Sequence, residues 1–577
     1  MRPDDRNAMS METLLKDFVR SSGRLILQVL VVSLMAPFGV GQTTPTVNTV
    51  FPSGGQSGTT FEVSITGTQV DSAAKLQSNI PGFESELLSP NRFRLTLPDA
   101  TPSGTYDIWA VGADGVSNPR TFLVGGHPEL MEVEPNDVDS AAMSVIVNRV
   151  INGQLDKSGD VDCYQFQATR GQRIIIECSA ERIDSRLRAV LEVFDVSGRR
   201  VAVNRGYFGV DPLIDFVAPS DGKYFVRVQD LISSGGAEFY YRLEFDTQPR
   251  VVFARPAVIQ QGQAARVTLF GWNLSGAGLP TSLKSGEISG VTDQQSGQDA
   301  ANESLRNAHH SGGGLEQLEI EIPATLAQPS KQIPVPLLPS QAVTTRNAFA
   351  FHLEGGNAPV MIGLTDLPVS LDLSNNHSPD FAQPIQVPSE VSGELTDASE
   401  QDWFAMDVQR GEVLHLAAFG QRISSPVDLQ ISVYDSEEHL LVQFNDEPKN
   451  PGGEFNTSHL DPAGRWVCPR NGRYFFVLRN LNRGVSSDLR RIYQFSVRRE
   501  EADFQVVAIP SIDGVKAMNI PQGGRQLLKL LAVRERGYDG TIRVTAKSLP
   551  GGIECPDIWF GPGVNHATMV ISADQAG

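Results

Sequence analysis

The sequence predicts an all-β protein: tandem β-sandwich or jelly-roll domains and immunoglobulin-like domains that follow an N-terminal signal peptide. Three observations support this fold class. Short runs of alternating apolar and polar residues recur along the chain, turn formers are abundant (53 glycines and 36 prolines), and almost no segment after residue 41 has a helical period. At roughly 100–150 residues per domain, a chain of 577 residues would hold four or five domains.

The N-terminus carries a short apolar run with a basic flank. Residues 24–35 read RLILQVLVVSLM, and small residues follow up to Gly41. The run is shorter than the ~20 residues that span a bilayer, so it predicts a signal peptide over residues 1–41, cleaved after Gly41. We therefore expect a secreted, periplasmic or cell-surface protein with no transmembrane segment beyond this leader.

The overall charge excludes one class of partner. The chain has 67 acidic and 48 basic side chains, a formal net charge of -19. A nucleic-acid binder needs a basic face to displace counterions from phosphates. We expect no nucleic-acid partner.

Two segments, residues 44–125 and 249–355, alternate with a period of two between turns, which predicts small sandwiches. Glycines, a proline and apolar residues recur at matching positions: Pro52, Gly58, Val63, Ile65 and Gly67 in the first, Pro256, Gly262, Val267, Leu269 and Gly271 in the second. On these residues both segments resemble immunoglobulin-like domains of the IPT/TIG type. The second has a polar insertion, residues 284–314, which we expect to be a mobile loop. It contains His309 and His310, a weak candidate for a metal site.

A stronger repeat relates residues 131–247, here called the first copy, to residues 372–499, the second copy. The recurring residues are Gly153, Leu155, Asp162, Arg170, Gly171, Arg182 and Ile183, matched by Gly393, Leu395, Asp402, Arg410, Gly411, Arg422 and Ile423. Each copy has about eight strand-like runs, which predicts a β-sandwich or jelly roll.

The two copies resemble the bacterial pre-peptidase C-terminal (PPC) domain. In the first copy, the motifs that carry the resemblance are Glu134-Pro135-Asn136-Asp137, Gly159-Asp160-Val161-Asp162, Ala218-Pro219 and Asp221-Gly222-Lys223-Tyr224. The second copy matches more weakly. Such domains typically trail exported peptidases, so the resemblance implies a peptidase-associated protein.

Acidic residues in the first copy form a candidate calcium site. Its members carry side-chain oxygens: Glu132, Glu134, Asn136, Asp137, Asp160 and Asp162. Alternate residues of an extended segment project to one side, and calcium takes six to eight oxygen ligands. If this segment lies beside the strand that opens at Asp162, five or six oxygens converge. The alternative is that Asn136 and Asp137 cap a turn while the glutamates are solvated.

The same pattern resembles the calcium site of the collagen-binding domains of bacterial collagenases. That resemblance implies calcium ligands at Glu132, Glu134, Asn136, Asp137 and Asp162, with Asp160 as a substitute for a further aspartate. In the second copy the equivalent residues are Asp372, Ser374, Asn376, His377, Glu400 and Asp402. With two carboxylates lost there, we expect no tight calcium binding in the second copy.

Cys163 and Cys178 flank a segment that reads as a hairpin, and an exported protein invites disulfides. Alternation turns Cys163 outward and Cys178 inward. This arrangement opposes a bridge unless the register changes or a bulge intervenes.

Some aromatic residues are candidates for a platform that stacks on polysaccharide: Tyr207, Phe208, Tyr240, Tyr241 and Trp272. The alternative, which we favour, is that one member of each adjacent pair faces the core. Residues 503–577 have too few strand-like runs to close a sandwich, so we expect a partial immunoglobulin-like unit.

No catalytic motif is found in the sequence. It has no His-Glu-x-x-His pair, no Gly-x-Ser-x-Gly elbow, no P-loop and no cysteines at metal-ligand spacing. We therefore expect a non-enzymatic binding or adhesion protein whose partner is an extracellular protein or polysaccharide. Two alternatives stay open: the accessory region of a secreted peptidase system, and an array of polysaccharide-binding modules.

Overall fold

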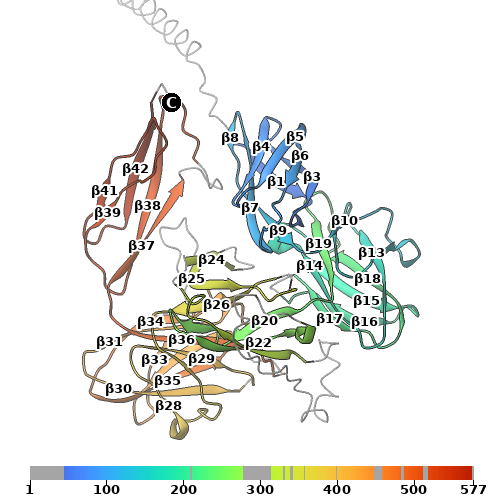
Figure 1. Ribbon diagram of the computed structural model, residues 1–577. Helices are drawn as coiled ribbons and strands as arrows, with labels where there is room; N and C mark the ends of the chain where they lie inside the picture. Colours follow the sequence, from blue (N-terminus) through green and yellow to red (C-terminus); the bar gives the residue numbers. More distant parts are fainter. Residues whose placement is uncertain are drawn as a thin grey trace, which may run out of the picture. The chain divides into compact units, whose positions relative to one another are not determined.

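The computed structural model describes residues 44–207, 211–276, 314–328, 332–337, 342–356, 358–397, 399–446, 458–482, 487–510 and 518–574. Within these ranges the chain is nearly all β, as predicted, and its strands form ten sheets (Figure 1). No helix in the described ranges is long and apolar enough to cross a membrane. The predicted signal peptide and almost all of the insertion at 284–314, with His309 and His310, lie outside the described residues.

Residues 46–125 form two sheets that enclose a core. In spatial order one sheet contains β1 (Thr46–Phe51), β3 (Thr60–Thr68), β6 (Arg92–Thr96) and β5 (Glu84–Ser89). The other contains β2 (Gly54–Gln56), β9 (Arg120–Gly125), β7 (Gly104–Gly112) and β4 (Ala73–Ser78), with β8 (Gly115–Val116) paired to β7. Alternate residues such as Val63 and Ile65 are buried between the sheets, as a period of two requires.

The first copy is a sandwich of two five-stranded sheets. One contains β10 (Glu129–Met131), β12 (Arg149–Gln154), β19 (Tyr240–Asp246), β14 (Arg173–Ser179) and β17 (Leu213–Val217). The facing sheet contains β11 (Met143–Ser144), β13 (Val161–Ala168), β18 (Gly222–Asp230), β15 (Ala189–Asp195) and β16 (Arg200–Asn204). Single turns of 3₁₀ helix, η1 (Asp139–Ala141) and η2 (Glu181–Ile183), lie in the connections.

The second copy has the same strand order. One sheet contains β27 (Val369–Leu371), β29 (Ser389–Glu394), β36 (Ile492–Arg499), β31 (Val413–Phe419) and β34 (Ala463–Val467). The other contains β28 (Gln383–Pro384), β30 (Gln401–Val408), β35 (Gly472–Asn480), β32 (Leu429–Tyr434) and β33 (Leu440–Phe444), and η5 (Pro379–Phe381) and η6 (Gln421–Ile423) recur in the connections. The recurring residues in the sequence therefore correspond to a recurring topology.

The part of the chain that follows the first copy and precedes the second in sequence also forms two sheets. One contains β20 (Arg250–Arg255), β22 (Ala265–Trp272) and β23 (Glu316–Ile322). A second contains β21 (Val258–Gln260), β26 (Val360–Thr365), β25 (Ala342–Phe351) and β24 (Gln332–Leu337), and η3 (Leu274–Gly276) follows β22.

The last part of the chain, after residue 502, has a four-stranded and a two-stranded sheet. The larger contains β37 (Asp503–Pro510), β38 (Arg525–Glu535), β42 (His566–Ala573) and β40 (Ile553–Glu554). The smaller contains β39 (Ile542–Val544) and β41 (Ile558–Phe560). The two sheets share a small buried core, which consists of Leu530, Ala532, Ile542, Phe560 and Met569.

The two cysteines of the first copy are not in a hairpin. β13, with Cys163, pairs with β18, whereas β14, with Cys178, pairs with β17 and β19 of the opposite sheet. Both thiols are buried and free. The hairpin interpretation was therefore wrong, because the chain between the cysteines crosses from one sheet to the other.

Candidate metal centre

An acidic segment, residues 132–138, follows β10 and packs against the sandwich. The Glu132 amide donates to the Asn152 carbonyl of β12 at 3.0 Å. The backbone amide of Cys163 in β13 donates to the backbone carbonyl of Asn136, also at 3.0 Å. These two hydrogen bonds hold the segment beside the start of β13, where Asp162 lies.

The segment and β13 bring three carboxylates together. One oxygen each of Glu132, Glu134 and Asp162 lies within 4.8 Å of the others. Asp162 and Asn136 are fully buried, and Asp160 is 3% exposed. Three of the six predicted residues thus form a cluster, and two more have buried side chains.

Several oxygens of this cluster are held by the scaffold while others are left free. Asp162 accepts a short hydrogen bond from Tyr241 at Oδ2, and Asp160 accepts from the Asp156 amide at Oδ2, 2.7 Å away. Asp162 Oδ1 and both side-chain amide atoms of Asn136 have no hydrogen-bond partner among the described residues, and Asp160 Oδ1 has only an ion pair with Lys157. Buried polar atoms are nearly always paired, so these free oxygens suit a hard cation.

Sequence reasoning missed two tyrosines that support the cluster. The hydroxyls of Tyr164 and Tyr241 are 2.5 Å apart, and Tyr164 donates to Glu132 Oε2 at 3.2 Å. A Cβ on Gly153 would collide with the Tyr241 ring, and the second copy repeats this contact between Gly393 and Tyr493. The recurrence of Gly153 as Gly393 was the signal that a ring passes over this position.

Burial makes negative charge costly in the cluster. Desolvation, then repulsion from Glu132, raises the pKa of Asp162 to about 9. Desolvation, with a smaller contribution from Glu134, raises the pKa of Glu132 to about 7. A bound divalent cation would offset this cost.

Asp137 lies at the rim of the cluster. It is exposed, and its Oδ2 is 3.4 Å from the ammonium of Lys157, which is also 3.4 Å from Asp160 Oδ1. Lys157 thus supplies some positive charge from the solvent side. Because its side chain is 66% exposed, it can swing away at little cost.

The aromatic candidates do not form a surface platform. Tyr240, Tyr241 and Trp272 are buried, and the Tyr240 hydroxyl donates to the Ile183 carbonyl. Tyr207 is partly buried, and Phe208 lies outside the described residues. As favoured from the sequence, one member of the pair, Tyr241, lies in the sandwich core, but its neighbour Tyr240 is buried as well. Trp272 packs with Ile175 and Leu213 in a smaller cluster.

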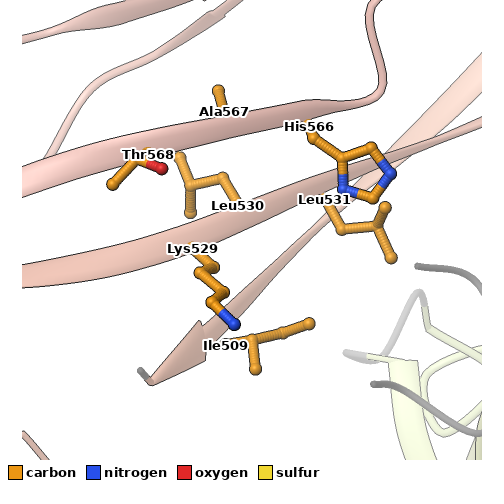
Figure 2. A pocket seen from close by; sticks show the side chains of 7 residues that line it. All are labelled: Ile509, Lys529, Leu530, Leu531, His566, Ala567 and Thr568. Atoms are coloured by element: carbon orange, nitrogen blue, oxygen red, sulfur yellow. The ribbon is translucent and has the colours of Figure 1, made fainter. Parts of the chain in front are cut away.

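A shallow hollow lies elsewhere, on the sheet of β37, β38 and β42. Its lining is Ile509, Lys529, Leu530, Leu531, His566, Ala567 and Thr568. Figure 2 shows Lys529 extending toward Ile509, with His566 beside Leu531. One lysine and one histidine among mainly apolar side chains do not form a convergent polar site, so the acidic cluster remains the better candidate.

Comparison with known families supports part of the predicted resemblance. Residues 160–230 match the bacterial pre-peptidase C-terminal domain. A probable subtilase-type serine protease of Deinococcus radiodurans is 28% identical over 212 residues, which are 33% of this chain. The matched region spans only 29% of that protease.

Solved structures give weak likenesses. The pre-peptidase C-terminal domain of a Bacillus anthracis collagenase is 20% identical, covering 20% of this chain and all of that one, with a TM-score of 0.16. A Bacteroides ovatus protein, SGBP-B from a mixed-linkage glucan utilization locus, solved with a heptasaccharide, is 9% identical and covers 79% of this chain and 76% of that one, with a TM-score of 0.14. Likeness at these scores carries no argument about function.

Proposed function

We propose that this chain is an exported binding protein built from β-sandwich modules. In the first copy, calcium would fix the acidic segment, residues 132–138, against the start of β13. The observation that carries the proposal is the pair of buried side-chain oxygens, Asn136 Oδ1 and Asp162 Oδ1, that have no hydrogen-bond partner among the described residues. Asp162 lies within the segment that matches the PPC domain. These groups serve binding and rigidity rather than bond breaking.

The residues that would hold calcium are those of the acidic cluster. Glu132, Glu134 and Asp162 would provide carboxylate oxygens, and Asn136 would provide a buried amide oxygen. Asp160 would join them once Lys157 moves away. The ion would supply positive charge that neutralises these carboxylates. Tyr241 and the Gln154 amide orient the cluster, because they bind the carboxylate oxygens of Asp162 and Glu132.

The function of the whole chain would be attachment outside the cytoplasm. The predicted leader over residues 1–41 and the PPC match support an extracellular or envelope location, and the acidic charge favours a protein or polysaccharide over nucleic acid as partner.

The second candidate is an accessory, non-catalytic region of a secreted peptidase system. It is favoured by the relative, a subtilase-type serine protease, and by the PPC match. Under this hypothesis the chain would bind a peptidase or its substrate.

The calcium proposal is tested on residues 42–577 by hydrogen exchange with and without millimolar calcium. Calcium is expected to slow exchange at residues 132–138 and at the start of β13. Asp162→Asn should abolish this response, while Asp402→Asn, at the equivalent position of the second copy, should preserve it. Equal exchange with calcium and with chelator would refute the proposed site.

The binding proposal is tested by a pull-down of native surface material with residues 42–577. Retention of envelope protein or polysaccharide, weakened by chelator, supports attachment. Recovery of an exported peptidase as the main partner would support the accessory role instead. Peptide or glycan turnover by the purified chain, lost on one side-chain replacement, would overturn both.

A further inference from the structure

The second copy gathers an imidazole where the first has only carboxylates and an amide. His377 takes the position of Asp137, and Glu400 takes that of Asp160. One donor atom each of His377, Glu400 and Asp402 lies within 4.8 Å of the others. With Asn376, these three residues are called the histidine cluster below.

In the histidine cluster each carboxylate has one oxygen held by the scaffold and one that faces the imidazole. Glu400 accepts from the Asp397 amide at Oε2, 2.9 Å away, and its Oε1 is 3.7 Å from His377 Nε2. Asp402 accepts from the Tyr493 hydroxyl at Oδ2, 2.6 Å away, and its Oδ1 is 3.3 Å from His377 Nδ1. Anchored carboxylates with a free oxygen are typical of preorganised metal ligands.

Asn376 gives an independent indication of a ligand. Its side chain is fully buried, and neither amide atom has a hydrogen-bond partner among the described residues. The backbone carbonyl of Asn376 accepts a hydrogen bond from the backbone amide of Trp403 at 2.7 Å, which places Asn376 next to Asp402. A buried polar atom left unpaired is destabilising, and coordination of a cation would satisfy the amide oxygen.

We propose that the histidine cluster binds a borderline transition metal such as Zn²⁺, through its imidazole, two carboxylates and buried amide oxygen. Imidazole nitrogen favours zinc and its neighbours, whereas calcium takes oxygen ligands. Zinc bonds of about 2.0–2.2 Å place the ligand atoms of a tetrahedral site about 3.3 Å apart. The separation of His377 Nδ1 from Asp402 Oδ1 has this value.

The competing possibility is that a protonated His377 itself neutralises the two carboxylates, with no metal. The two hypotheses differ in what the chain takes up. A metal site binds one equivalent of ion through the imidazole nitrogen, while an ion pair with His377 binds none.

The test is a cobalt titration of untagged residues 42–577 in millimolar calcium, which would occupy the first-copy cluster under the proposed function. Visible absorption reports Co²⁺ held by nitrogen and oxygen ligands, and Zn²⁺ should displace it. His377→Asn is expected to weaken binding at least about tenfold. His377 is 44% exposed, so the variant should fold, which circular dichroism checks.

A matched control is His439→Asn. His439 also lies 3.5 Å from each of two carboxylates, those of Asp435 and Glu437, but its side chain is 69% exposed and that of Glu437 is 78% exposed. This variant, and one with His309 and His310 both replaced by Asn, should bind cobalt as the parent does. No cobalt uptake, or equal affinity in His377→Asn and His439→Asn, would overturn the proposal.

Discussion

Single residues determine the electrostatics of the first copy. Asp162 is fully buried, and burial together with Glu132 raises its pKa to about 9. Its Oδ2 is fixed by Tyr241, so the carboxylate cannot turn to solvent. Without a cation, the ionised form of Asp162 therefore destabilises the fold.

The pH dependence of stability without metal follows from these shifts. Carboxyls of the unfolded chain titrate near about 4, whereas the folded-state pKa values are about 7 for Glu132 and about 9 for Asp162. Between these values the folded state keeps protons that the unfolded state has released. Its stability without metal therefore falls as pH rises from about 4 to about 9.

Asp162→Asn should flatten this fall, because Asn cannot ionise and still accepts from Tyr241. The loss of stability is measured as the free energy of opening of β13, obtained by hydrogen exchange in the presence of chelator at pH 5 to 9. We expect a decline of at least about 1 kcal/mol in the parent and a smaller one in the variant. Asp402→Asn, in the second copy, is the control. A flat or rising parent profile would contradict the burial argument.

At the scale of an element, a buried aspartate holds the 3₁₀ turn after β14. Asp211 accepts hydrogen bonds from the amides of Ala180, Glu181 and Arg182, and from Arg182 Nε at 2.8 Å. The second copy repeats the motif, with Asp461 bound to the amides of residues 420–422 and to Arg422 Nε. The recurring Arg182 and Arg422 are thus structural residues.

Asp211→Ala should destabilise the first copy by at least about 2 kcal/mol, because it removes the acceptor of three turn amides and of Arg182 Nε. Arg182 keeps its ion pair with Glu177, so its charge stays compensated. Proteolysis at increasing urea, followed by mass spectrometry of first-copy peptides, gives the midpoint. Glu238→Ala, which breaks the exposed pair with Arg186, is the control, with an expected loss under about 1 kcal/mol. Similar losses in the two variants would show that the Asp211 network contributes little.

The placement of β13 and β14 in opposite sheets keeps the thiols of Cys163 and Cys178 apart, and both thiols are buried. Burial raises the pKa of Cys163 to about 11 and that of Cys178 well above its usual range, which leaves both as unreactive thiols. Cys468 is also buried, whereas Cys555 is partly exposed.

In the native chain, a thiol reagent should therefore modify Cys555 alone, and the other three cysteines only after unfolding. Absorbance of the released thiolate counts the reacted groups, and Cys555→Ser should abolish the native reaction. A Cys163–Cys178 disulfide, seen as two missing thiols in the unfolded chain, would contradict the separation of the strands.

At the scale of the whole molecule, charge limits the partners. With a formal net charge of -19, the chain should be repelled by polyanions. We expect residues 42–577 to pass through a heparin or DNA column at physiological salt. Retention that falls with rising salt would reveal a basic face that the overall charge conceals.

The sequence by itself determined the β class, the repeat and the residues that face inward. Alternation with a period of two sets the face of each side chain, so Tyr164 and Phe166 lie in the core as expected. The repeat fixed a shared strand order, and the spacing of Glu132, Glu134 and Asp162 indicated a cluster.

Only the tertiary structure decided which strands are neighbours. Alternation does not show in which sheet a strand lies. The segment from Cys163 to Cys178 was therefore interpreted as a hairpin, although β13 and β14 belong to opposite sheets. Nor could alternation show that Tyr241 reaches Asp162, since 79 residues separate them along the chain. In both clusters a backbone hydrogen bond joins the segment to the next strand, from Cys163 to Asn136 and from Trp403 to Asn376, and only the tertiary structure shows these contacts.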